Sequence, residues 1–100
     1  MTNVAIITAL AAEMHPIVRE LRLRRRDADF VGDGIIATVA GLGAARVVAA
    51  CRRLIETHDP QRLVLAGFAG GLGPFLRPGY VFIPQQVINE HGDVMQLVSD

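Results

Sequence analysis

Short apolar runs alternate with amphipathic segments along the first two thirds of the chain. Residues 4–10 form a β-branched apolar run without polar alternation, which is typical of a strand covered on both faces. Residues 11–21 place apolar side chains, Leu21 among them, at helical spacing on one core-facing stripe, and Pro16 fits best in a first turn. The pattern therefore predicts a buried central strand followed by a helix that begins near Ala12 or Glu13.

A hairpin follows the first helix. Residues 22–29 are polar and basic, with three consecutive arginines, and predict a solvated loop. The Gly-Asp-Gly segment at residues 32–34 has the chemistry of a tight turn. It predicts that Phe30-Val31 pairs with a second core strand at residues 35–40.

The rest of the chain continues the alternation. Residues 44–58 predict a second helix, with Ile55 facing the core and Arg53 facing water, and Asp59-Pro60 ends it. Residues 62–66 predict a third apolar strand. Residues 80–89 and 94–98 predict a final strand pair. Because crossovers between parallel strands are right-handed, this order predicts an α/β fold with three parallel long strands and helices on the faces. We expect residues 1–100 to form a single domain.

Composition narrows the possible partners. The chain has 100 residues, of which 51% are hydrophobic, and ten basic residues balance ten acidic ones. This balance argues against general binding of nucleic acid or of anionic membranes. The single Cys51 suits a reducing compartment, so we expect a cytoplasmic protein. The three histidines are dispersed, and we expect no metal site.

The three predicted parallel strands end in segments suited to ligand binding. These are residues 8–13, 40–43 and 67–71, and the last two are rich in glycine. In α/β sheets, ligands bind at the carboxyl ends of strands, and glycine lets a ligand approach the backbone. We therefore expect the segments to converge on one pocket, the alternative being that each is an ordinary tight turn.

Residues 41–46 begin like a dinucleotide fingerprint, but Arg46 stands where the third glycine is needed. No lysine completes a phosphate-binding loop of the ATPase type. The helix N-terminus behind Gly43 could still hold a phosphate through free N–H groups, with Arg46 as a cationic supplement.

These segments together resemble a known family. VAIITALAAEM at residues 4–14, AGLG at 40–43 and LAGFAGGL at 65–72 are followed by LRPG at 76–79 and VFIP at 81–84. They resemble the nucleoside phosphorylase and nucleosidase superfamily, most closely the methylthioadenosine/S-adenosylhomocysteine nucleosidases and the phosphorylase-like proteins of hopanoid gene clusters. The resemblance covers about the first half of a family member. It implies a three-layer αβα fold with a mixed, mainly parallel central sheet, of which this chain is the N-terminal half.

The resemblance also implies a reaction and its residues. The reaction is cleavage of the N-glycosidic bond of a purine-type nucleoside, with water as acceptor in a nucleosidase and phosphate as co-substrate in a phosphorylase. Glu13 matches the glutamate that orients and deprotonates the water. Leu42, Phe68, Ala69 and Gly70 match positions that line the substrate. Without the resemblance, Glu13 is interpreted as a carboxylate favoured by the helix dipole.

Departures from the family pattern leave alternatives open. Phe68 replaces a serine that helps to hold the nucleophile, and its ring either packs in the core, which we favour, or stacks on a ligand. Tyr80 replaces an acidic residue. The family's ribose-binding and base-protonating segments lie in its second half, and Ser99-Asp100 comes too early to be the latter. We therefore expect the isolated chain to be inactive as an enzyme, with a catalytically inactive nucleoside-binding or interaction module as the alternative. The resemblance also implies a homodimer and no further cofactor.

Overall fold

The computed structural model describes residues 2–97 and forms two units, Met1–Ala69 and Gly70–Asp100. The elements of each unit follow in chain order. The first unit holds β1 (Val4–Thr8), α1 (Ala11–Leu21), β2 (Arg24–Arg26), β3 (Asp29–Gly32), β4 (Ile35–Val39), α2 (Ala44–His58) and β5 (Arg62–Leu65). The second unit holds β6 (Gln86–Ile88) and β7 (Val94–Gln96).

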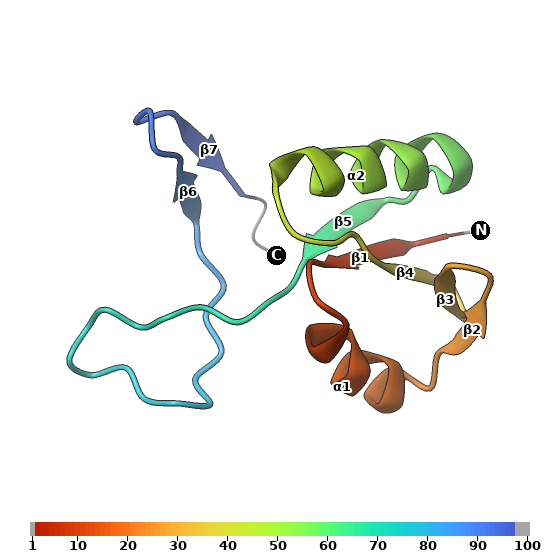
Figure 1. Ribbon diagram of the computed structural model, residues 1–100, viewed down its shortest axis with the longest axis horizontal. Helices are drawn as coiled ribbons and strands as arrows, with labels where there is room; N and C mark the ends of the chain where they lie inside the picture. The colour runs from red at the N-terminus through yellow and green to blue at the C-terminus, as the bar shows by residue number, and fades with distance from the viewer. Residues whose placement is uncertain (1, 98–100) are drawn as a thin grey trace. The chain divides into compact units, whose positions relative to one another are not determined.

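A mixed sheet of five strands, in the order β2-β3-β4-β1-β5, organises the first unit (Figure 1). β1 lies between β4 and β5 and runs parallel to both, with Ile6 opposite Ala37 on one side and Val64 on the other. β3 is antiparallel to β2 and to β4. The predicted central strand, the three parallel long strands and the hairpin are thereby confirmed.

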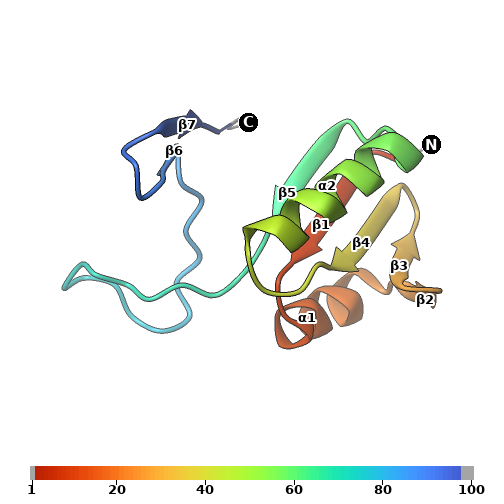
Figure 2. The same ribbon diagram turned by 45° about the horizontal axis from the view of Figure 1, so that its top comes forward.

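The two faces of the sheet are covered by different helices (Figure 2). Ala5 and Ile7 of β1 pack toward α2, where Leu54 is fully buried. Ile6, between them, points to the opposite face and packs with Met14 of α1. This alternation is the period of two that a strand imposes, and it explains why residues 4–8 are apolar throughout. The first unit thus has the three layers of an αβα fold.

Several local expectations were wrong. Arg24, Arg25 and Arg26 are exposed, as expected of a solvated segment, but they form strand β2 rather than a loop. The Arg25 guanidinium lies 5.5 Å from the centre of the Phe30 ring. Helix α1 begins at Ala11, so Pro16 lies inside the helix rather than in its first turn. Leu21 and Ile55, expected to face the core, are 44% and 48% exposed. The buried faces of α1 and α2 are therefore narrower than the spacing of apolar residues in the sequence indicates.

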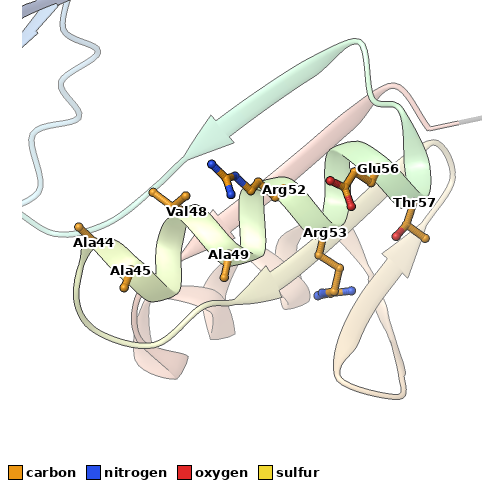
Figure 3. Close-up of a pocket in the computed structure, with 8 residues that line it drawn as sticks. All are labelled: Ala44, Ala45, Val48, Ala49, Arg52, Arg53, Glu56 and Thr57. Carbon is orange, nitrogen blue, oxygen red and sulfur yellow. The ribbon is translucent and has the colours of Figure 1, made fainter.

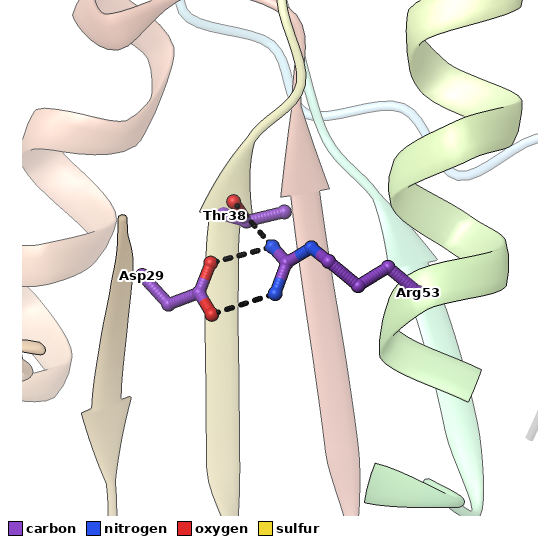
Figure 4. Close-up of polar contacts among 3 residues, drawn as sticks. All are labelled: Asp29, Thr38 and Arg53. Carbon is purple, nitrogen blue, oxygen red and sulfur yellow. Dashed lines mark hydrogen bonds and ion pairs between the residues drawn. The ribbon is translucent and has the colours of Figure 1, made fainter. Parts of the chain in front are cut away.

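Arg53 of α2 was expected to face water but forms an ion pair across the sheet face (Figure 4). Its Nη2 and Nη1 donate to the two Asp29 carboxylate oxygens at 2.6 and 2.9 Å, and Nη2 also reaches the Thr38 hydroxyl at 3.3 Å. Such a two-pronged pair is geometrically specific, because the planar guanidinium matches the carboxylate. It fixes α2 against the hairpin.

The ion pair predicts a pH-dependent stability. The Arg53 hydrogen bonds lower the pKa of Asp29 below its ordinary value. A lowered pKa stabilises the fold above the unfolded pKa of about 4, and this contribution is lost as the pH falls through the folded value. We expect Asp29→Asn to cost about 1 kcal/mol at pH 7 and less at pH 3, which lies below the unfolded pKa, as measured by urea unfolding. Asp33→Asn, at the exposed turn of the same hairpin, is the matched control, and an equal loss at both pH values would contradict the assignment.

The second unit contains an antiparallel pair, with Val87 opposite Met95. Asn89 shapes its turn, because its side-chain oxygen accepts the N–H groups of His91 and Asp93, each at 2.9 Å. The predicted pair is confirmed in its central part, but β6 is shorter than the range 80–89, and position 98 lies outside the described residues. Within residues 2–97, no helix combines the length and the apolar composition that a membrane crossing requires.

Candidate functional site

Backbone hydrogen bonds join the carboxyl ends of β1, β4 and β5. The Gly41 N–H, just after β4, donates to the Ala9 carbonyl at 3.1 Å. The Ala66 N–H, just after β5, donates to the Ile7 carbonyl at 3.0 Å. The structure therefore brings together the ends of the three parallel strands, as far as residues 41 and 68. These ends lie side by side, and the expectation that they line one pocket stays a prediction.

Glu13 bridges two of the segments with its carboxylate. Its Oε1 accepts the N–H of Leu10, the residue that precedes α1, at 2.9 Å. Its Oε2 accepts the N–H of Phe68, 55 residues further along the chain, also at 2.9 Å. The first contact is the reach-back of a helix-capping glutamate, whereas the second is a tertiary contact that capping does not require. The carboxylate is therefore fixed between the β1 and β5 ends.

Gly67 leaves the space that this carboxylate occupies. A Cβ atom on Gly67 would lie 2.8 Å from Oε2 of Glu13 and 3.4 Å from its Cδ. Real Cβ atoms do not approach other atoms so closely, so any other residue here displaces the glutamate side chain. The glycine-rich segment is visible in the sequence, but its partner Glu13 is not, because a contact across 54 residues leaves no local signal.

The surroundings favour the charged form of Glu13. The backbone N–H of Phe68, then that of Leu10, lowers the pKa of the Glu13 carboxyl from its ordinary value, against a smaller opposing effect of burial. Glu13 is therefore a carboxylate at neutral pH. A carboxylate has about four acceptor positions, and these N–H groups do not fill all of them, so a position remains for a water molecule or a hydroxyl.

The segment after β4 is exposed and opens helix α2. The Leu42 side chain is 66% exposed, and Gly43 precedes the helix with a φ of 96° that only glycine adopts readily. Arg46 folds back over Gly41, because a Cβ built there would lie 2.9 Å from its Cδ and 3.1 Å from its Nη1. Gly43 and Arg46 thus flank the same turn, and phosphate binding there stays a prediction.

The segment after β5 has its main chain in the site and its side chains in solvent. The Phe68 side chain is 77% exposed, so the expected packing of its ring in the core was wrong. Ala69 is also exposed and ends the first unit. Gly70 is the first residue of the second unit, and its contact with substrate stays a prediction from the resemblance.

An open hollow of about 740 Å³ lies elsewhere, on the outer face of α2 (Figure 3). Small side chains of the first turns, among them Ala45 and Ala49, line it together with Arg52 and Glu56. Its lining includes none of the residues that the sequence analysis assigns to the site. We therefore place the candidate site at Glu13, where hydrogen-bonding groups converge. No group of three or more metal-ligating side chains occurs within residues 2–97.

Comparison with protein families gives one match. The family model described as the phosphorylase superfamily matches residues 3–98, which is nearly the whole chain. Searches of curated proteins and of solved structures found no match.

Proposed function

Because this chain belongs to the phosphorylase superfamily, we propose that it binds a purine-type nucleoside and contributes to cleavage of its N-glycosidic bond. The superfamily as a whole binds nucleosides. The observation that carries the proposal is the carboxylate of Glu13, held by Leu10 and Phe68 at the strand ends where α/β sheets bind ligands. Leu42, Phe68 and Ala69, with Gly70, are the proposed substrate contacts.

Glu13 is the proposed base for the nucleophile. In hydrolysis, the water oxygen bonds to the anomeric carbon as the carbon–nitrogen bond breaks, and the purine leaves with the electron pair of that bond. The proton that the water loses goes to Glu13, while a separate acid protonates the departing purine. A positioned general base of this kind contributes about 100-fold or more to the rate. The resemblance places the acid in a segment without a match in residues 1–100, so we propose that these residues form the nucleophile side of the site.

The acceptor is tested by dependence on phosphate. Gly43 and Arg46 favour phosphate as the acceptor. Phe68 favours water, because it lacks the serine hydroxyl that the family has at this position as a phosphate contact. Our experiment incubates the protein, purified as its native source makes it, with a panel of purine nucleosides and measures free base with and without inorganic phosphate. Release without phosphate identifies a hydrolase, and release only with phosphate identifies a phosphorylase. If no nucleoside yields free base under either condition, cleavage is excluded.

A nucleoside-binding module without activity is the second candidate. Phe68 favours it, because a phenyl ring stands where the family holds its nucleophile with a serine hydroxyl, and the ring is exposed enough to stack on a base. Calorimetry with the same nucleosides separates the two functions. Binding without base release supports the module, and release supports the enzyme.

The other expectations stay proposals. We propose a cytoplasmic location, since the single Cys51 suits a reducing compartment. We propose a homodimer because the resemblance implies one. We also propose that the two units belong to one domain.

A further inference from the structure

A buried hydroxyl lies next to the candidate site and has no role in the proposed mechanism. Thr8 ends β1, and only 1% of its surface is exposed. Its Oγ1 donates a hydrogen bond to the Leu10 carbonyl at 3.0 Å. A polar group at the end of an otherwise apolar strand costs free energy unless it is paired, and this one is paired within the turn that leads to Glu13.

The Leu10 residue is held from both sides. Its carbonyl accepts the Thr8 hydroxyl and also the N–H of Glu13, the latter at 3.1 Å. Its own N–H donates to the Glu13 carboxylate at 2.9 Å. The peptide group that carries this N–H is fixed at its other end, because the Ala9 carbonyl accepts the N–H of Gly41. Leu10 is extended, with φ −118° and ψ 147°, and the Thr8 bond restrains the peptide group that follows it.

We propose that Thr8 is a positioning residue: by holding the Leu10 carbonyl, its buried hydroxyl keeps the Leu10 N–H directed at the carboxylate of Glu13. This inference rests on the proposed function only in giving Glu13 a catalytic task. The positioning itself follows from hydrogen bonds within the first unit. Thr8 touches neither the nucleophile nor the substrate in this arrangement and acts through Leu10.

Thr8→Val is the test, because valine has nearly the same shape and lacks the hydroxyl. With the Leu10 N–H less firmly held, the carboxylate loses stabilisation and the pKa of Glu13 rises toward its ordinary value. We expect kcat to fall about tenfold, the scale of one hydrogen bond, with KM almost unchanged. The acidic limb of the pH profile of kcat/KM moves to higher pH. Thr8→Ser, which retains the hydroxyl, restores both the rate and the profile.

Thr38→Val is the matched control. Thr38 is similarly buried, at 3% exposure, and lies near the end of β4, but its hydroxyl contacts Arg53 and not Leu10. This variant loses a buried hydroxyl from the same sheet and leaves the pKa of Glu13 unchanged. If Thr8→Val does not fold, Thr8→Ala, which is smaller, replaces it in every comparison.

An NMR titration of the glutamate carboxyl groups separates the two proposals, since it needs no turnover. A rise in the pKa of Glu13 in Thr8→Val but not in Thr38→Val supports the positioning role even if no nucleoside is cleaved. If Thr8→Val leaves that pKa unchanged, or if Thr38→Val raises it equally, the positioning role is overturned while base release by the native protein still stands.

Discussion

Glu13→Gln is expected to lower kcat/KM for base release by about 100-fold or more, the usual contribution of a general base. The substitution keeps the length of the side chain and removes its charge. Glutamine presents one oxygen and one NH₂ group, so only one of the N–H groups of Leu10 and Phe68 retains an acceptor. The variant can therefore neither take the proton of the nucleophile nor bridge the two strand ends. Steady-state kinetics with the best nucleoside of the panel measures the loss.

Glu20→Gln is the matched control for this variant. Glu20 lies on the same helix and is exposed, so the substitution makes the same change of charge on α1 away from the strand ends. We expect its kcat/KM to remain within about twofold of the native value, as for most exposed positions away from a site. If Glu13→Gln folds and retains native turnover, Glu13 is not the base. Unfolding measurements on both variants exclude a loss of structure as the cause.

The pH dependence follows from the same hydrogen bonds. Because the N–H groups of Phe68 and Leu10 lower the pKa of Glu13, the carboxylate stays charged to lower pH than an isolated glutamate. As the proposed general base, Glu13 is therefore expected to be active across the neutral range, with its protonation limiting the rate only on the acidic side.

The sequence predicted the frame of the first unit because its periodicities are local. The apolar run at residues 4–8 requires burial on both faces, and α2 begins and ends at its predicted residues, Ala44 and His58. Which side chains of each stripe are buried depends on the partner surface. Leu54 reaches the sheet, whereas its neighbour Ile55 is turned by about 100° around the helix and is half exposed.

The candidate site was predictable only in part. Glu13 could be identified because the segments around it resemble a family, and Gly67 belonged to a segment expected to approach a ligand. The partners of Glu13 could not be derived, since both are backbone N–H groups, which every residue except proline possesses. The pairing of Arg53 with Asp29 was missed for a similar reason: arginine on a helix face is normally solvated, and only the packing of α2 over the hairpin brings the two together.

Gly67→Ala is expected to reduce turnover by about 100-fold, since a displacement of roughly 1 Å at a reacting group has an effect of that size. The three atoms nearest to the added Cβ all belong to the Glu13 side chain, the closest at 2.8 Å. Gly67 is not among the glycines with positive φ, so alanine fits its backbone and the collision alone is tested. To accommodate the methyl group, the carboxylate must shift from its present position at the N–H of Phe68.

A double-mutant cycle with Glu13→Ala shows whether this collision is the cause. If Gly67→Ala acts by displacing the Glu13 side chain, it destabilises the native protein more than the Glu13→Ala protein, because the obstructing atoms are gone in the latter. The free energies of unfolding of the four proteins give the coupling directly, without reference to activity. Equal destabilisation in both backgrounds would mean that Gly67 is needed only for the turn after β5. It would contradict the claim that Gly67 leaves room for the Glu13 carboxylate.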